Sequence, residues 1–162
     1  MSKILLVCFV SSKIGIGHLS RMLVLANNLK TVHSVIPEFL IFGDLVKKNE
    51  LANFNVHNLQ LEKNFVASLE NILDQINFDA IVFDIYPKYQ KDNLDKLFKE
   101  LKQRNIISIA IDSLIQYRNI MDLIWIPSFN FDCTKYHDSK AILKSGWDSF
   151  LIKKRVKQIC IL

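Results

Sequence analysis

The stretch ILLVCFVSSKIGIGHLSRMLVLANNLK (Ile4–Lys30) changes from a strand-like to a helix-like pattern within a few residues. Its first seven residues form a continuous apolar run, which is typical of a strand buried on both faces of a parallel sheet. From His18 onward, apolar residues recur at the spacing of one helix face. The turn between them holds Gly15 and Gly17, two of the chain's four glycines. The stretch therefore predicts a strand, a glycine turn and a helix.

The rest of the chain continues this alternation. The strands that we expect are Ile4–Val10, Glu38–Gly43, Phe54–Leu61, Asp79–Asp84, Ile106–Asp112 and, as the last of the sheet, Asp122–Pro127. The helices that we expect are His18–Lys30, Val66–Ile76 and Lys91–Arg104. This order predicts an α/β fold, with a Rossmann-like parallel sheet and helices on both faces. Beyond Pro127 the sequence indicates a loop and then a segment of ambiguous pattern.

Composition and charge narrow the function classes. A chain of 162 residues, half of them hydrophobic, fits one domain with a sizeable core. The net charge of +5 favours anionic ligands or peripheral contact with a membrane surface, while the scattered lysines argue against nucleic acid. Three cysteines without CxxC spacing argue against a disulfide framework and a zinc site. No signal peptide or membrane-spanning run is visible, so we expect a cytoplasmic protein. We also expect neither a metal nor a cofactor.

Polar residues follow three of the expected strands. The glycine turn and His18 come after the first strand, Asp84 ends "AIVFD", and Asp112 ends "IISIAID". Ligands of open α/β sheets bind outside the carboxyl ends of the strands. The sequence therefore predicts that Asp84 and Asp112 join the glycine turn in one site.

The glycine turn has the features of an anion site. It presents free backbone N–H groups and the positive end of a helix dipole. The phosphate-binding candidates are Gly15, Ile16, Gly17 and Arg21. A Walker A loop is excluded, because its lysine and Ser/Thr are absent. The dinucleotide pattern GxGxxG is incomplete, because Ser20 occupies the third glycine position, although Asp44 after the second strand keeps a dinucleotide oxidoreductase open.

His18 is the candidate catalytic base. A helix N-terminus favours the neutral form of a histidine, and a neutral imidazole can accept a proton. The alternative is a capping or packing residue without chemistry. The spacing alone leaves both interpretations open.

The stretch GIGHLSRMLVLANNLK resembles the GxGHxxRxLxLAxxL signature of the N-terminal domain of GT-B-type enzymes. It is similar above all to the UDP-sugar hydrolase family of the pseudaminic acid pathway, and also to MurG-like glycosyltransferases. Three later segments are similar to further motifs of this family, in the same order. AIVFDIY is similar to VVxDxY, IAIDSLIQYRNIMDLIWIPSFN to IDDLxxxxxxxDLLLxQN, and SGWDSFLIKKR to GxxYxLLR. The sequence departs from these motifs at Ser113, which replaces the second aspartate, and at the tyrosine of GxxY.

The resemblance implies roles and partners. It places His18 beside the scissile sugar–phosphate bond, where it activates water, and places Tyr86 in the active site. It implies a nucleotide sugar, UDP-linked, as the substrate, in the biosynthesis of bacterial surface glycans. It also implies that a second, C-terminal domain reads most of the nucleotide.

The end of the chain bears on domain organisation. The resemblance implies that residues 1–152 form the N-terminal domain and that 153–162 form a linker and the first strand of the C-terminal domain, within which the given sequence ends at Leu162. We therefore expect the N-terminal half of an enzyme that is inactive alone and self-associates weakly. The alternatives are one subunit of a two-chain glycosyltransferase and a non-catalytic module that binds a phosphate.

Overall fold

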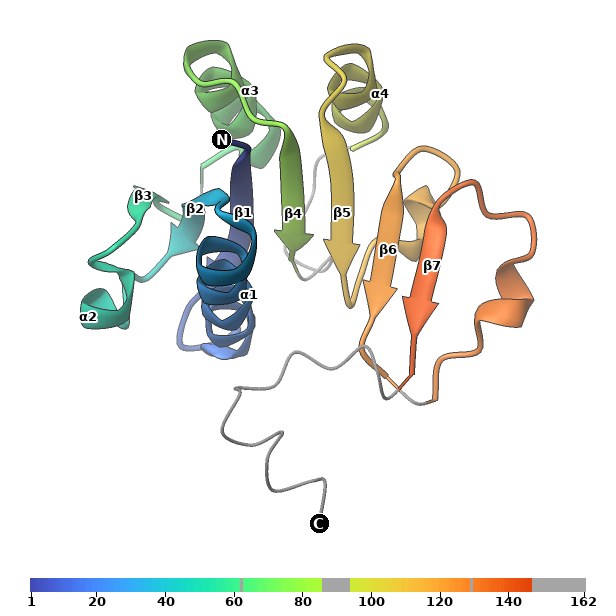
Figure 1. The fold of residues 1–162 in the computed structure, drawn as a ribbon, viewed down its shortest axis with the longest axis horizontal. Coiled ribbons are helices and arrows are strands. Elements are labelled where there is room, and N and C mark those ends of the chain that lie inside the picture. Colours follow the sequence, from blue (N-terminus) through green and yellow to red (C-terminus); the bar gives the residue numbers. More distant parts are fainter. Residues whose placement is uncertain (62, 86–93, 129, 147–162) are drawn as a thin grey trace.

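A seven-stranded parallel sheet forms the centre of the molecule. The computed structural model describes residues 1–61, 63–85, 94–128 and 130–146. The strand order is β3-β2-β1-β4-β5-β6-β7, and all neighbours pair in parallel (Figure 1). The strands are β1 (Lys3–Val10), β2 (Ile36–Gly43), β3 (Asn55–Leu59), β4 (Ala80–Asp84), β5 (Ile107–Ile111), β6 (Leu123–Ile126) and β7 (Ile142–Ser145). This confirms the predicted Rossmann-like α/β fold.

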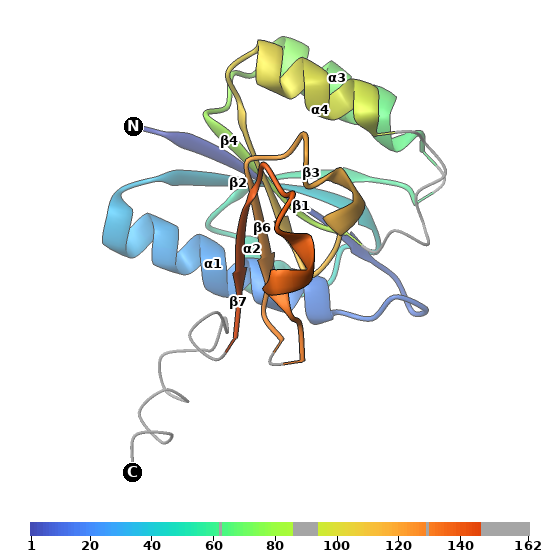
Figure 2. The same ribbon diagram turned by 90° about the vertical axis from the view of Figure 1, so that its right-hand side faces the viewer.

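Helices cover both faces of this sheet. The α-helices are α1 (Gly17–His33), α2 (Lys48–Leu51), α3 (Phe65–Gln75) and α4 (Asp95–Gln103). Figure 2 shows α1 on one face and α3 with α4 on the other. Each face of the sheet therefore has its own hydrophobic cluster. Leu19, Met22 and Leu23 of α1 pack in one, and Leu69 of α3 and Phe98 of α4 pack in the other. None of the described helices is long and apolar enough to cross a membrane.

Local sequence explains where the helices begin and end. The side chain of Asn64 caps α3 by accepting a hydrogen bond of 2.8 Å from the backbone N–H of Ala67. Helix α1 ends at His33, and the next residue, Ser34, has a left-handed backbone conformation and donates its N–H to the carbonyl oxygen of Leu29. By contrast, no side chain caps the start of α1, where Ile16 precedes the first helical residue. That start is therefore open to an external acceptor.

The sheet extends one strand further than the sequence predicts. Asp122–Pro127 was expected to be the last strand, but β7 pairs with β6 beyond it. The four residues of β7 are half-buried or exposed in alternation, so they lack the continuous apolar run that marks the central strands. The structure also has two short 3-10 helices, Ile115–Tyr117 and Cys133–Tyr136, and the second lies in the segment expected to be a loop. An edge strand needs little apolar burial, and the sequence signal is correspondingly small.

Gly43 allows the end of β2 to approach the end of β1 closely. Its φ is +111°, and a Cβ atom there would lie 1.9 Å from the carbonyl oxygen of Val10. The next residue, Asp44, donates its backbone N–H to the same oxygen at 2.9 Å. Only glycine fits both the backbone conformation and this contact.

We expect Gly43→Ala to destabilise the protein. The unfavourable φ alone lowers the free energy of unfolding by about 1–3 kcal/mol, and displacement of the Val10 carbonyl adds to this. Gly17→Ala is the matched control, because its added Cβ meets nothing within 4 Å. Urea unfolding measures both variants. Equal stability of the two alanine variants would contradict the role assigned to Gly43.

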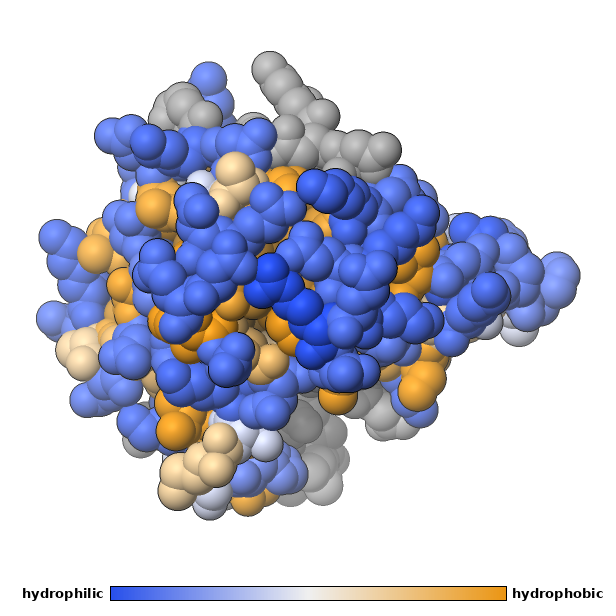
Figure 3. Space-filling model, turned by 90° about the horizontal axis from the view of Figure 1, so that it is seen from above, coloured by the Kyte–Doolittle hydropathy of each residue, from blue (hydrophilic) through white to orange (hydrophobic). Residues whose placement is uncertain are grey.

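A buried ion cluster lies toward the amino ends of β1, β2 and β3. The Glu38 side chain is 2% exposed, and its oxygens lie 3.2 Å from Lys3 Nζ and 3.3 Å from His57 Nε2. Burial raises the pKa of Glu38, but hydrogen bonds from His57 and Lys3 outweigh burial, so the pKa lies below its ordinary value. The surface at this end of the sheet carries mainly hydrophilic residues (Figure 3).

The cluster predicts a pH-dependent stability. Because the folded pKa of Glu38 lies below the unfolded one, its ionised form contributes stability at neutral pH, and that stability is lost as the pH falls through the folded pKa. Glu38→Gln should therefore lower the free energy of unfolding by about 1–3 kcal/mol at pH 7. The difference from the unmodified protein should shrink at low pH. A difference that stays constant in urea unfolding between pH 7 and pH 3 would contradict this account.

Candidate active site at the carboxyl ends of β1, β4 and β5

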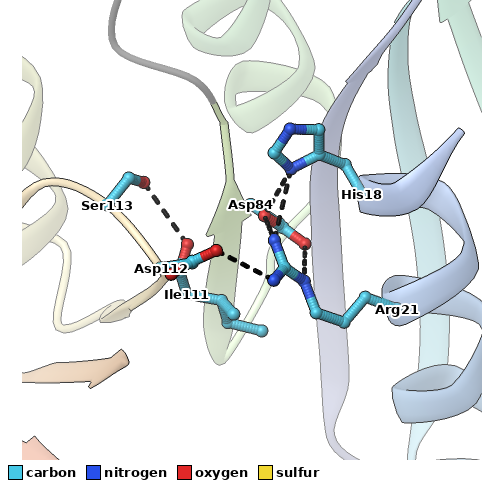
Figure 4. Close-up of polar contacts among 6 residues, drawn as sticks. All are labelled: His18, Arg21, Asp84, Ile111, Asp112 and Ser113. Atoms are coloured by element: carbon cyan, nitrogen blue, oxygen red, sulfur yellow. Dashed lines mark hydrogen bonds and ion pairs between the residues drawn. The ribbon is translucent and has the colours of Figure 1, made fainter. Parts of the chain in front are cut away.

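The strand order places the candidate site. Strands β2 and β3 extend the sheet from β1 toward one edge, and β4 to β7 extend it toward the other edge. The direction in which strands are added therefore reverses between β1 and β4. Such a switch point, at the carboxyl ends of the strands, is where open α/β sheets bind ligands. Helix α1 starts there and contributes His18 and Arg21, while Asp84 ends β4 and Asp112 follows β5. The structure thus brings together four of the predicted residues (Figure 4).

Asp84 is the centre of the cluster. Its side chain is fully buried, and it accepts hydrogen bonds from both neighbours on α1. Arg21 donates through Nε to Oδ2 at 2.8 Å and through Nη2 to Oδ1 at 2.7 Å, and His18 Nδ1 lies 2.7 Å from Oδ1. A buried carboxylate requires such partners, because an unpaired charge in the interior is strongly destabilising.

The contact with Asp84 defines the tautomer of His18. An ionised carboxylate only accepts hydrogen bonds, so Nδ1 at 2.7 Å must carry the proton. Arg21 Nη2 also lies 3.4 Å from Nδ1, but two donors do not bond to each other, and both share Asp84 Oδ1. The lone pair of a neutral imidazole is then on Nε2, which has no partner among the described residues. The His18 side chain is 19% exposed, so ligands can reach the ring.

Arg21 ties the site together across two strands. In addition to Asp84, it donates from Nη1 to Asp112 Oδ2 at 3.0 Å. Burial lowers the pKa of Arg21, but hydrogen bonds and charge from Asp84 and then Asp112 outweigh burial, so the pKa lies above its ordinary value. Arg21, which the sequence suggested as a phosphate-binding residue, therefore has all three guanidinium nitrogens bonded to carboxylates. Figure 4 shows the guanidinium between the two aspartates.

Asp112 lies directly after β5, where its side chain reaches Arg21. Asp112 has a φ of +62°, and its backbone N–H donates to the carbonyl oxygen of Trp125 at 2.8 Å. Its side chain is 46% exposed, in contrast to that of Asp84. Ser113, which follows it, donates its hydroxyl to the carbonyl oxygen of Ile111 at 3.3 Å. Ser113 thus has a local role in the turn.

The glycine turn leaves the start of α1 accessible. Gly15 has a φ of +83° and donates its N–H to the carbonyl oxygen of Ser11 at 2.7 Å, which closes the turn. The Ile16 residue is 49% exposed, and the space around the Cα of Gly17 is open. In the described part of the chain, no group accepts from the N–H groups of Gly17 and His18. These donors could hold one anionic group beside His18.

Cys8 lies on β1 beside Asp84 of β4 and forms no part of the candidate site. It pairs in register with Asp84 and is fully buried. Burial raises the pKa of its thiol far above the ordinary value, and the charge of Asp84 adds to this. The thiol therefore stays protonated and serves as a small apolar core residue.

Sequence reasoning predicted that the residues of this candidate site lie together, but it did not predict the hydrogen bonds between them. It predicted both aspartates from their strand ends, without their link through Arg21. The three-residue spacing of His18 and Arg21 on one helix face was the available signal. Tyr86 and the expected segment 153–162 lie outside the described residues. Among the described residues, no group of three or more His, Cys, Asp and Glu side chains could hold a metal ion.

The fold defines the chain as a Rossmann-like α/β domain. Comparison with known proteins adds no narrower assignment: no family model matches the chain, and no curated protein matches it significantly.

Proposed function

We propose that this chain is the N-terminal, water- or acceptor-side domain of a GT-B-type enzyme that acts on a nucleotide sugar. The observation that carries the proposal is the hydrogen bond of 2.7 Å between His18 Nδ1 and the buried Asp84. It leaves Nε2 as a proton acceptor beside a helix start that lacks a cap. The sequence resemblance to GT-B-type enzymes supplies the substrate class, a UDP-linked sugar.

The proposed step uses His18 as a general base. Nε2 takes a proton from a water molecule or an acceptor hydroxyl as its oxygen forms a bond to the anomeric carbon. The bond between that carbon and the diphosphate oxygen breaks, and its electron pair leaves with the nucleoside diphosphate. Asp84 stabilises the imidazolium that forms, as a carboxylate does in other histidine dyads. Hydrolysis and transfer differ only in which oxygen attacks.

Charge around the dyad suits this step. Asp84 and Asp112 both pair with Arg21, so the two carboxylates exceed the one guanidinium charge and leave a negative charge that favours the imidazolium. The first N–H groups of α1 have no acceptor among the described residues, so they can stabilise negative charge that develops on a leaving diphosphate. Arg21 is then a positioning residue for Asp84 and His18. Its contacts support this role better than direct binding of phosphate.

Calorimetry tests the proposal by measuring how tightly UDP-N-acetylglucosamine, UDP and NAD bind to the full chain. The described side of the cleft offers a few N–H groups and little surface for a base, so we expect UDP compounds to bind only in the millimolar range. Micromolar or tighter binding of UDP would contradict a half-site. Binding of NAD in preference to UDP would favour the dinucleotide alternative. Turnover with His18 variants, described below, separates an enzyme from a binding module.

A further inference from the structure

The two carboxylates hold the Arg21 guanidinium in different ways. Asp84 is fully buried and accepts from Nε at 2.8 Å and from Nη2 at 2.7 Å. Asp112 is 46% exposed and accepts only from Nη1, at 3.0 Å. Two nitrogens of Arg21 are therefore bonded inside the protein, and the third is bonded at its surface (Figure 4).

The buried pair is fixed, whereas the exposed pair can exchange. Breaking the bidentate pair would leave Asp84 as an uncompensated buried charge, which is strongly unfavourable. An exposed ion pair contributes little to stability, because water solvates both groups when they separate. Asp112 gives up a single hydrogen bond when it leaves Nη1, and its Oδ1 atom already has no partner among the described residues. Nη1 is therefore the nitrogen of Arg21 that a ligand can reach most easily.

The backbone of Asp112 does not have to move in such an exchange. Its N–H is bonded to the carbonyl oxygen of Trp125 at 2.8 Å, and its φ of +62° is a conformation that aspartate adopts more readily than most residues. Rotation about the side-chain bonds is enough to release Nη1. The exchange thus needs no rearrangement of the sheet.

An anionic group at Nη1 would lie beside His18. Arg21 Nη2 is 3.4 Å from His18 Nδ1, so the guanidinium is next to the proposed base. Phosphate and carboxylate oxygens accept hydrogen bonds from a guanidinium in the same way. Two anions at the same nitrogen would repel each other. A phosphate group can therefore bind Arg21 only when Asp112 leaves.

We propose that Asp112 is an internal competitor for Nη1, and that a phosphate or diphosphate group of the substrate displaces it. This assignment rests on the proposed function, which supplies a diphosphate beside His18. Arg21 keeps its positioning role through Nε and Nη2, while the partner of Nη1 changes from Asp112 to the ligand. Asp112 thus weakens the binding of anions and sets the affinity of the site for its substrate.

The test is the affinity of the full chain for inorganic pyrophosphate, measured by calorimetry with and without the substitution Asp112→Asn. The asparagine keeps the size of the side chain and can accept from Nη1, but it carries no charge. We expect the variant to bind pyrophosphate about 3- to 10-fold more tightly, because the ligand no longer displaces a charged partner. Equal or weaker binding by the variant would overturn the proposal, as would a lack of binding by both proteins at tens of millimolar.

Asp138→Asn is the matched control. Asp138 is 51% exposed, pairs with Arg118 and precedes β7, at the amino end of the sheet. Its replacement removes the same charge from another exposed arginine pair, so it measures the effect of net charge alone. The control should bind pyrophosphate as the unmodified protein does. A gain in affinity as large as that of Asp112→Asn would overturn the proposal.

The ¹³C signals of the aspartate carboxyl groups give a second readout, which a purely structural role of Asp112 would not change. Addition of pyrophosphate should shift the carboxyl signal of Asp112, because that group loses its guanidinium partner. The signal of Asp84 should change much less, because its bonds to Nε and Nη2 remain. Equal shifts of both signals, or no shift of the Asp112 signal, would overturn the exchange.

The two proposals can fail separately. Unchanged pyrophosphate affinity in Asp112→Asn, combined with loss of turnover in His18→Asn, would overturn the exchange and leave the proposed function intact. Tighter binding in Asp112→Asn, combined with turnover that is indifferent to His18→Asn, would support the exchange and overturn the proposed function.

Discussion

Replacing Asp84 with asparagine is expected to impair both catalysis and folding. The amide retains one acceptor oxygen, and its NH₂ group faces a donor on His18 or Arg21. Without the carboxylate, His18 loses its fixed tautomer, and turnover in the complete enzyme should fall roughly 10³- to 10⁴-fold. The free energy of unfolding should fall by about 2–4 kcal/mol, because Arg21 loses its buried partner.

Asp112→Asn is the matched control for this variant. It removes the same charge from the same guanidinium, but the Asp112 side chain is 46% exposed and contacts only Nη1. The expected loss of stability is below about 1 kcal/mol. Urea unfolding and the rate of UDP release from UDP-N-acetylglucosamine compare the two variants. If both changed stability equally, Asp84 would not be the centre of the site.

Replacing His18 with asparagine is expected to abolish most catalysis without unfolding the protein. An asparagine amide can still donate to Asp84, but it offers no basic nitrogen to the substrate. Loss of a general base lowers turnover by about 100- to 10,000-fold. The measurement is UDP release by the assembly in which a nucleotide-binding domain completes the cleft, whether that domain continues this chain or is a separate subunit.

His33→Asn provides the control on the same helix. His33 is exposed at the far end of α1, and its replacement should leave turnover unchanged. Near-normal turnover of the His18→Asn protein would remove His18 from the mechanism. Binding of UDP-sugars without turnover by the unmodified assembly would favour the non-catalytic module.

The central strands and the location of the candidate site could be predicted from the sequence, because burial on both faces demands continuous apolar runs. Strand β1 and strand β4 have such runs, and the polar residue that ends β4 is Asp84. Their neighbours in the sheet follow from the order of the elements. The position of a site residue at a strand end is thus encoded locally.

The links between those residues could not be predicted in the same way. Arg21 reaches Asp84 and Asp112, which are 63 and 91 residues away in the chain. Long-range side-chain contacts depend on strand order and on the rotation of α1, and neither leaves a local pattern. A guanidinium after a glycine turn favours phosphate on local grounds alone. The two carboxylates that occupy it become visible only in the folded protein.

The central claim is that Asp84 holds His18 with Nδ1 protonated and Nε2 free to accept a proton. Long-range ¹H–¹⁵N spectra of the histidine rings in the full chain test it at pH 8.5, above the ordinary histidine range of about 6.5. The account predicts a protonated Nδ1 and a bare Nε2 for His18, and a loss of this preference in Asp84→Asn. A His18 protonated on Nε2, or a spectrum unchanged by Asp84→Asn, would contradict it.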